Sequence, residues 1–176
     1  MAAVLDPRPS TMPPTAFVER FGGIYEHSPW VADAVAAAGV TASDDAPAAL
    51  AARMAAVVEA AGEPRQLALL RAHPELAGKL AVAGGLTAES QSEQASARLD
   101  QCTPDEFARF TALNSAYGAK FGFPFIIAVR GLRRADIIAA FARRLDNSPA
   151  EEFRAALDQV HKIARLRLAA LPQSEA

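Results

Sequence analysis

The chain has 176 residues, 51% of them hydrophobic, and a formal net charge of −2. This composition suits one globular domain, and the near balance of 18 basic and 20 acidic residues excludes a broad basic surface for nucleic acid. No apolar run reaches the roughly 18 to 20 residues that a membrane helix needs, so we expect no membrane partner. The single cysteine, Cys102, excludes an internal disulfide and is typical of a reducing cytoplasm. It is either a small apolar residue or a nucleophile.

Residues 1–14 contain several prolines and lack the basic region and apolar core of a secretory signal. We therefore expect a flexible leader over 1–14, a helical domain over 15–171 and a flexible tail over 172–176. The tail does not end in the Ser-Lys-Leu signal of peroxisomal proteins, which favours a cytoplasmic location.

The first half of the chain predicts a series of short helices, because apolar residues recur at helical spacing between glycines and prolines. These helices begin at Thr15, at Pro29, after the polar loop 41–47 and at Pro64. Pro74 then interrupts the pattern and predicts a new short helix over 74–81. His73 would lie directly before the start of that helix.

The second half continues with helices capped by Thr87 and Thr103, the latter ending at Gly122. The apolar stripe of this longer helix is made of Phe107, Phe110, Tyr117 and Phe121. An aromatic and β-branched stretch follows near 123–130, and with no partner strand it predicts an extended connection. Two further helices, the last over 149–171, complete an all-α, single compact domain of roughly eight helices.

The last predicted helix carries a charge on its apolar face, which is costly unless the charge is paired. The apolar face is made of Phe153, Leu157, Val160, Ala164, Leu168 and Leu171. At about 100° per residue, Arg167 falls within this arc and Arg165 falls outside it. Arg167 is either a clamp for an anion, which its guanidinium group suits, or an arginine that reaches past the edge or pairs with a structural acid.

Other polar residues have two interpretations as well. Asn114 lies on the apolar stripe of its helix and would hold either a substrate amide or a loop backbone. At a helix start, His73 would lie near free amide groups, either as a proton-transfer group or as a cap. We interpret His27 and His161 as structural or exposed residues.

We expect the helix face with Ser90, Glu93 and Gln94 to be exposed to solvent, because the opposite face is apolar. That face carries Ala88, Ala95 and Leu99. No HExxH motif, cysteine pair or close histidine pair predicts a metal site, and no glycine-rich phosphate loop predicts a nucleotide cofactor. One histidine, one glutamate and one misplaced arginine suit acid–base chemistry on a small anion without a cofactor.

Five segments, in this order and at this spacing, resemble the 2-oxo-4-hydroxy-4-carboxy-5-ureidoimidazoline (OHCU) decarboxylases over most of the chain. They are FGGIYEHSPWVA at 21–32, HPELAGK at 73–79, LTAESQSEQ at 86–94, LNSAYGAKFGFPFIIAVRG at 113–131 and HKIARLRL at 161–168. The resemblance implies a cofactor-free homodimer that decarboxylates this small molecule to (S)-allantoin in urate degradation. It implies that His73, Glu93 and Arg167 are catalytic, with His73 as general acid or base and Arg167 as a clamp for an anionic or carbonyl oxygen.

The same resemblance implies a substrate-binding set around these three residues. This set is Pro74, Ser90, Gln94, Phe123, Phe125, Ile126 and Ile127. Glu26 and Trp30, also in a matching segment, either reach the pocket or pack the second helix, and we favour packing. The alternative from a different class is a non-catalytic helical module that binds a ureide or a purine-like ligand without converting it.

Overall fold

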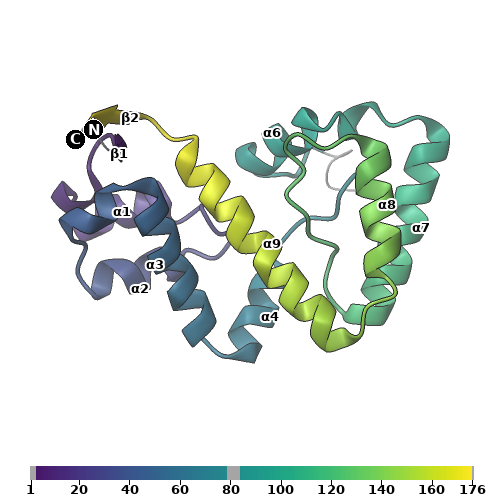
Figure 1. Cartoon of the computed structure of the whole chain (residues 1–176), viewed down its shortest axis with the longest axis horizontal. Coiled ribbons are helices and arrows are strands. Elements are labelled where there is room, and N and C mark those ends of the chain that lie inside the picture. The colour runs from purple at the N-terminus through teal and green to yellow at the C-terminus, as the bar shows by residue number, and fades with distance from the viewer. Residues whose placement is uncertain (1–2, 79–83, 176) are drawn as a thin grey trace. The chain divides into compact units, whose positions relative to one another are not determined.

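The computed structural model of the chain (Figure 1) describes residues 3–78 and 84–175. Within these residues the all-α prediction is confirmed, with eight α-helices and one two-stranded sheet. The helices are α1 Pro14–Phe21, α2 Trp30–Ala37, α3 Pro47–Ala60, α4 Glu63–Arg71, α6 Ala88–Ser96, α7 Pro104–Phe121, α8 Arg134–Arg144 and α9 Pro149–Ala169. Among the described helices, none is long and apolar enough to cross a membrane.

The chain divides into two compact units. The terminal unit contains residues 1–72 and 161–176, and the central unit contains residues 73–160. Helix α9 begins in the central unit and ends in the terminal unit. We describe each unit by itself.

The core of the terminal unit is formed by α1, α2 and α3, which contact one another in chain order. Proline opens α1 and α3, where its missing N–H is of no consequence. Leu50, Met54 and Val58 recur four residues apart on α3 and are completely buried. Val58 is the buried valine of this helix, and its neighbour Val57 is only half-buried.

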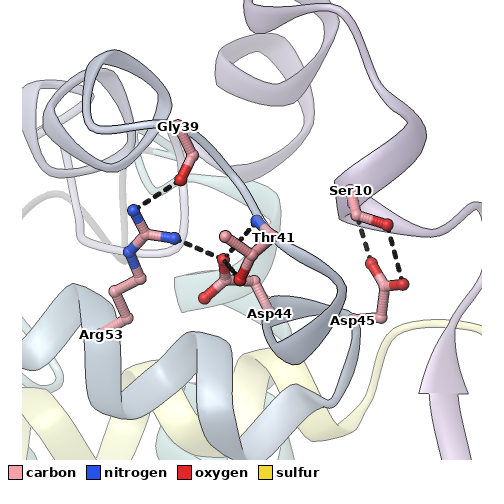
Figure 2. Close-up of polar contacts among 6 residues, drawn as sticks. All are labelled: Ser10, Gly39, Thr41, Asp44, Asp45 and Arg53. Atoms are coloured by element: carbon pink, nitrogen blue, oxygen red, sulfur yellow. Dashed lines mark hydrogen bonds and ion pairs between the residues drawn. The ribbon is translucent and has the colours of Figure 1, made fainter.

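The predicted leader and tail pair with each other. Strand β1 (Ala3–Leu5) runs antiparallel to β2 (Gln173–Glu175), and Leu5 is completely buried. The N–H and the hydroxyl of Ser10 also donate to the carboxylate of Asp45, at 2.8 and 2.9 Å (Figure 2). Residues predicted to be loose at both ends of the chain are thus held by the terminal unit, because β1 finds its partner at the far end of the sequence.

A buried carboxylate organises the predicted polar loop 41–47. Figure 2 shows Asp44, which is 4% exposed, bonded to the N–H of Thr41 at 2.7 Å and paired with Arg53 of α3. Arg53 also donates to the carbonyl of Gly39 at 2.7 Å. Because the buried charge is paired and hydrogen-bonded, the loop is tied to the helix that follows it.

The core of the central unit is aromatic. The ring of Tyr117 on α7 forms T-shaped contacts with Phe125 and Phe141, with centroids 5.4 and 5.7 Å apart, and Phe125 stacks on Phe141 at 3.9 Å. The predicted stripe of α7 is wrong at Phe107, which is 39% exposed. Gly122 ends α7 in the left-handed conformation with φ of 75°, as its position predicts.

The predicted extended connection near 123–130 is confirmed, since these residues belong to no helix and no strand. Phe123, Phe125 and Ile126 are almost completely buried. Side chains from α8 and α9, rather than a neighbouring strand, hold the backbone of this segment.

Candidate active site

The central unit contains nearly all of the predicted site residues. These are His73, Pro74, Ser90, Glu93, Gln94, Phe123, Phe125, Ile126 and Ile127. Arg167 belongs to the terminal unit. His73, Ser90 and Gln94 are buried, with exposed fractions of 8%, 4% and 5%.

The sequence predicts a helix over 74–81, but residues 74–78 form no helix. Residues 74–78 form a turn, with Ala77 in the left-handed region at φ of 48°, and residues 79–81 lie outside the described part of the chain. His73 therefore does not lie at the start of a helix that Pro74 opens.

Two side chains take the place of helical hydrogen bonds in this turn. Gln94 accepts from the N–H of Ala77 at 3.1 Å and donates to the carbonyl of Glu75 at 3.2 Å. Asn114 donates to the carbonyl of Leu76 at 2.9 Å. Three successive residues are thus bonded to α6 and α7, so the loop after His73 has a fixed backbone. Of the two interpretations of Asn114, the structure shows the one in which it binds a loop backbone.

The prediction that the Ser90, Glu93 and Gln94 face of α6 is exposed to solvent is wrong. Ser90 and Gln94 face inward and Glu93 is half-buried, while Ala88 and Ala95 are exposed. The reason is the loop after His73, whose polar backbone needs the amide of Gln94. The cap is confirmed, because the hydroxyl of Thr87 accepts from the N–H of Ser90 at 3.3 Å.

Two cavities adjoin this loop, and Ala77 and Phe107 line both. One has a volume of about 570 Å³ and also includes Leu86, Gln94 and Leu99 in its wall. The other has a volume of about 560 Å³ and is lined by Glu75 and Asn114, among others. These volumes suit a small organic molecule. His73 does not line either of the two.

In the terminal unit, the prediction that Arg167 rather than Arg165 faces inward is confirmed, since Arg167 is 5% exposed and Arg165 is exposed. Its Nη1 atom lies 2.8 Å from Oε2 of Glu26, which is 1% exposed. The same nitrogen donates to the carbonyls of Gly23 and Ile24 at 3.2 and 3.4 Å.

Glu26 is therefore buried as the ion-pair partner of Arg167, which is the structural acid that one interpretation of Arg167 required. Its backbone is fixed as well, because the hydroxyl of Ser28 donates to its carbonyl at 3.0 Å. One feature of the sequence could have indicated that Glu26 is buried. It directly follows Ile24 and Tyr25, two large side chains that are buried in the structure. Trp30 does pack within the terminal unit, where the guanidinium group of Arg65 lies 4.9 Å from its ring centroid.

His161 makes structural contacts within the terminal unit. Its Nδ1 atom lies 2.8 Å from the hydroxyl of Tyr25, and its Nε2 atom lies 2.8 Å from a carboxylate oxygen of Glu59. Burial, and then the charge of Glu59, raise the pKa of Tyr25 far above its usual range. The phenol of Tyr25 therefore stays protonated beside the ring. His27 is exposed.

The described part of the chain indicates neither a metal centre nor an activated thiol. Within residues 3–78 and 84–175, no group of three histidine, cysteine, aspartate or glutamate side chains could hold a metal ion. Partial burial and the nearby carboxylate of Glu106 raise the pKa of the Cys102 thiol, which opposes formation of a nucleophilic thiolate.

Comparison with known proteins decides the family. The sequence pattern of the family described as OHCU decarboxylase matches residues 10–169. The chain belongs to the OHCU decarboxylase family. The OHCU decarboxylase of Haloferax volcanii is 45% identical over 91% of both chains, and that of Mus musculus is 40% identical over 86% of this chain and 84% of its own. The prediction of a carboxy-lyase is thereby confirmed.

Solved structures agree with this assignment. A crystal structure of (S)-allantoin synthase aligns with 96% of this chain at a TM-score of 0.77 and 36% identity, and the chain spans 54% of that longer protein. A crystal structure of an OHCU decarboxylase in the presence of (S)-allantoin covers 80% of this chain and 88% of its own, with a TM-score of 0.62. At 21% identity, this second likeness supports the fold alone.

Proposed function

We propose that this OHCU decarboxylase converts OHCU to (S)-allantoin in urate degradation, without a cofactor and with His73 as general acid or base. The observation that carries the proposal is the family match over residues 10–169. The burial of His73 beside a loop that three side-chain hydrogen bonds hold in place supports its role. A proton-transfer group works best when its position is fixed before the substrate arrives.

The substrate explains how the reaction proceeds without a cofactor. The bond to the carboxylate breaks and carbon dioxide leaves. The released electron pair forms a C=C bond to the neighbouring ring carbon, while the π electrons of the C=N bond move to the ring nitrogen, which takes a proton from solvent. The adjacent hydroxyl then loses a proton and becomes a carbonyl, and one proton is added to a single face of the carbon that becomes the stereocentre. His73 removes the hydroxyl proton or delivers the new one.

The other residues bind and orient the substrate. We assign Glu93, Ser90 and Gln94 to the ureido group and the ring, with Pro74 and the backbone around Phe123–Ile127 completing the pocket. Gln94 uses one lone pair and one N–H for the loop, so its amide retains capacity for a ligand. Arg167 binds an anionic or carbonyl oxygen, a role that rests on the family match.

The test of this function is stereochemical. Upstream enzymes supply fresh OHCU while optical activity is followed, with wild type expected to form (S)-allantoin rapidly. His73→Ala should leave only slow, racemic product. The matched control is His27→Ala, because His27 is exposed and should not affect the rate. Formation of (S)-allantoin by His73→Ala at the wild-type rate would falsify the role of His73. Binding of (S)-allantoin without any acceleration by wild type would favour the ureide-binding module.

We also propose a cytoplasmic homodimer, on the family resemblance alone. Light scattering on the purified chain measures the mass directly, and a particle with the mass of one chain at micromolar concentration would contradict the dimer.

A further inference from the structure

The peptide groups on both sides of Ile127 are held by side chains. Arg144 of α8 donates through Nη1 to the carbonyl of Ile126 at 2.6 Å, and Gln159 of α9 accepts from the N–H of Ala128 at 3.0 Å. All four residues belong to the central unit. The two bonds fix the peptide planes before and after Ile127.

Each fixed peptide plane also fixes the group at its opposite end. These peptide bonds are trans, and a trans peptide directs its C=O and its N–H in opposite directions. The N–H of Ile127 therefore points away from Arg144, and the carbonyl of Ile127 points away from Gln159. Ile127 is half-exposed, and nothing in the described ranges 3–78 and 84–175 bonds to either group. One donor and one acceptor are left for a ligand.

Arg144 cannot turn away from this position, because a completely buried carboxylate holds it. Glu152 accepts from Nε of Arg144 at 2.8 Å, from the hydroxyl of Tyr117 at 2.5 Å and from the amide of Asn147 at 2.8 Å. The guanidinium group also lies 4.5 Å from the ring centroid of Phe125. Burial, and then the bond to Glu152, raise the pKa of Tyr117, so the phenol remains a donor.

We propose that Arg144 and Gln159 are positioning residues, which hold the N–H and C=O of Ile127 as a donor–acceptor pair for the ureido group of the ligand. A ureido group carries N–H and C=O side by side, so it complements such a pair. Glu152 does not contact Ile127 in this scheme, but it holds Arg144 in position through the bond to its Nε atom. This inference rests on the proposed function for the identity of the ligand.

The experiment compares two substitutions at Gln159, which is half-exposed and leaves the buried Glu152 cluster intact. Gln159→Met removes the acceptor, and Gln159→Glu keeps one. We expect Gln159→Met to raise KM about three- to tenfold, the value of one hydrogen bond, with little change in kcat. Hydrogen exchange at the Ala128 amide should accelerate in the same variant. Gln159→Glu should retain both wild-type values.

Gln66→Met is the matched control. Gln66 donates to the carbonyls of Val58 and Glu59 in the terminal unit, at 3.0 and 3.2 Å. Its loss should lower the melting temperature without raising KM. The inference is overturned if Gln159→Met keeps the wild-type KM, if exchange at Ala128 is unchanged, or if Gln159→Glu is equally impaired. If wild type binds (S)-allantoin but accelerates nothing, the proposed function fails, and the Kd for (S)-allantoin replaces KM in this comparison.

Discussion

The carboxylate of Glu26 lies 2.8 Å from the guanidinium group of Arg167, and both side chains are at least 95% buried. A buried charge that loses its partner destabilises a protein far more than the loss of the whole pair does. The stability of single and double substitutions of Glu26 and Arg167 therefore tests whether the two charges are coupled.

Glu26→Met should lower the free energy of unfolding by about 3 to 5 kcal/mol, because it leaves the Arg167 charge uncompensated. Arg167→Met should have a similar effect for the opposite reason. The double substitution should be more stable than either single one, since two apolar side chains can pack where the pair was. Urea denaturation of all four proteins measures this coupling. A double variant whose loss equals the sum of the two single losses would show that the pair is not coupled.

Asn114→Asp should destabilise the loop after His73. The change keeps the size of the side chain but removes the donor to the carbonyl of Leu76, leaving that acceptor without its bond. We expect a loss of about 1 to 3 kcal/mol in urea denaturation, with a fall in decarboxylation rate at temperatures where the protein is still folded. Thr111→Val on the same helix is the control. Thr111 is exposed and bonds only within α7, so equal losses in both variants would argue against the loop contact.

High pH should destabilise the protein through its two tyrosines. Folding raises the pKa of both Tyr25 and Tyr117 above the unfolded value of 10.0. Above that pH the unfolded chain releases these protons while the folded chain keeps them, so the free energy of unfolding falls as the pH rises. Tyrosinate absorbance and helical circular dichroism should therefore change together in an alkaline titration. Reversible ionisation of either tyrosine in the folded protein would contradict this prediction.

Asp45→Ala should release the N-terminal segment. Asp45 is 5% exposed and accepts both hydrogen bonds of Ser10. Hydrogen exchange at the Ser10 amide should accelerate strongly, and the free energy of unfolding should fall by about 2 kcal/mol, typical of bonds to a charged group. Asp33→Ala, at an exposed position of α2, provides the comparison. Unchanged exchange at Ser10 would mean that β1 alone holds the segment.

Local signals account for most of the helices. Pro104 at the start of α7 and Gly122 at its end act on their own residues, so they can be recognised without the fold. Pro74 carries the same signal but opens no helix within the described residues, because Gln94 and Asn114 bind the backbone there. Those two partners lie at least 17 positions away, beyond the range of any local pattern.

Some residues of the candidate site could likewise be recognised from local patterns, and others could not. Arg167 was identifiable from the face of its helix, because a charge on an apolar stripe is visible in the sequence. Its partner Glu26 was not, since only folding brings residues so far apart in the chain together. The pairing of β1 with β2 is equally remote. The roles assigned to His73 and Glu93 come from the family motifs, and composition alone would not have distinguished them from structural residues.

The terminal unit joins the two ends of the chain, and this has a consequence for biosynthesis. About 140 residues separate Glu26 from Arg167, so at roughly 5 to 20 residues per second the ribosome delivers the arginine some 7 to 30 seconds after the glutamate. During that interval the carboxylate cannot form its ion pair with Arg167. The central unit is one contiguous stretch and can be complete first. We therefore expect the part of the chain that is made first to complete its buried ion pair last.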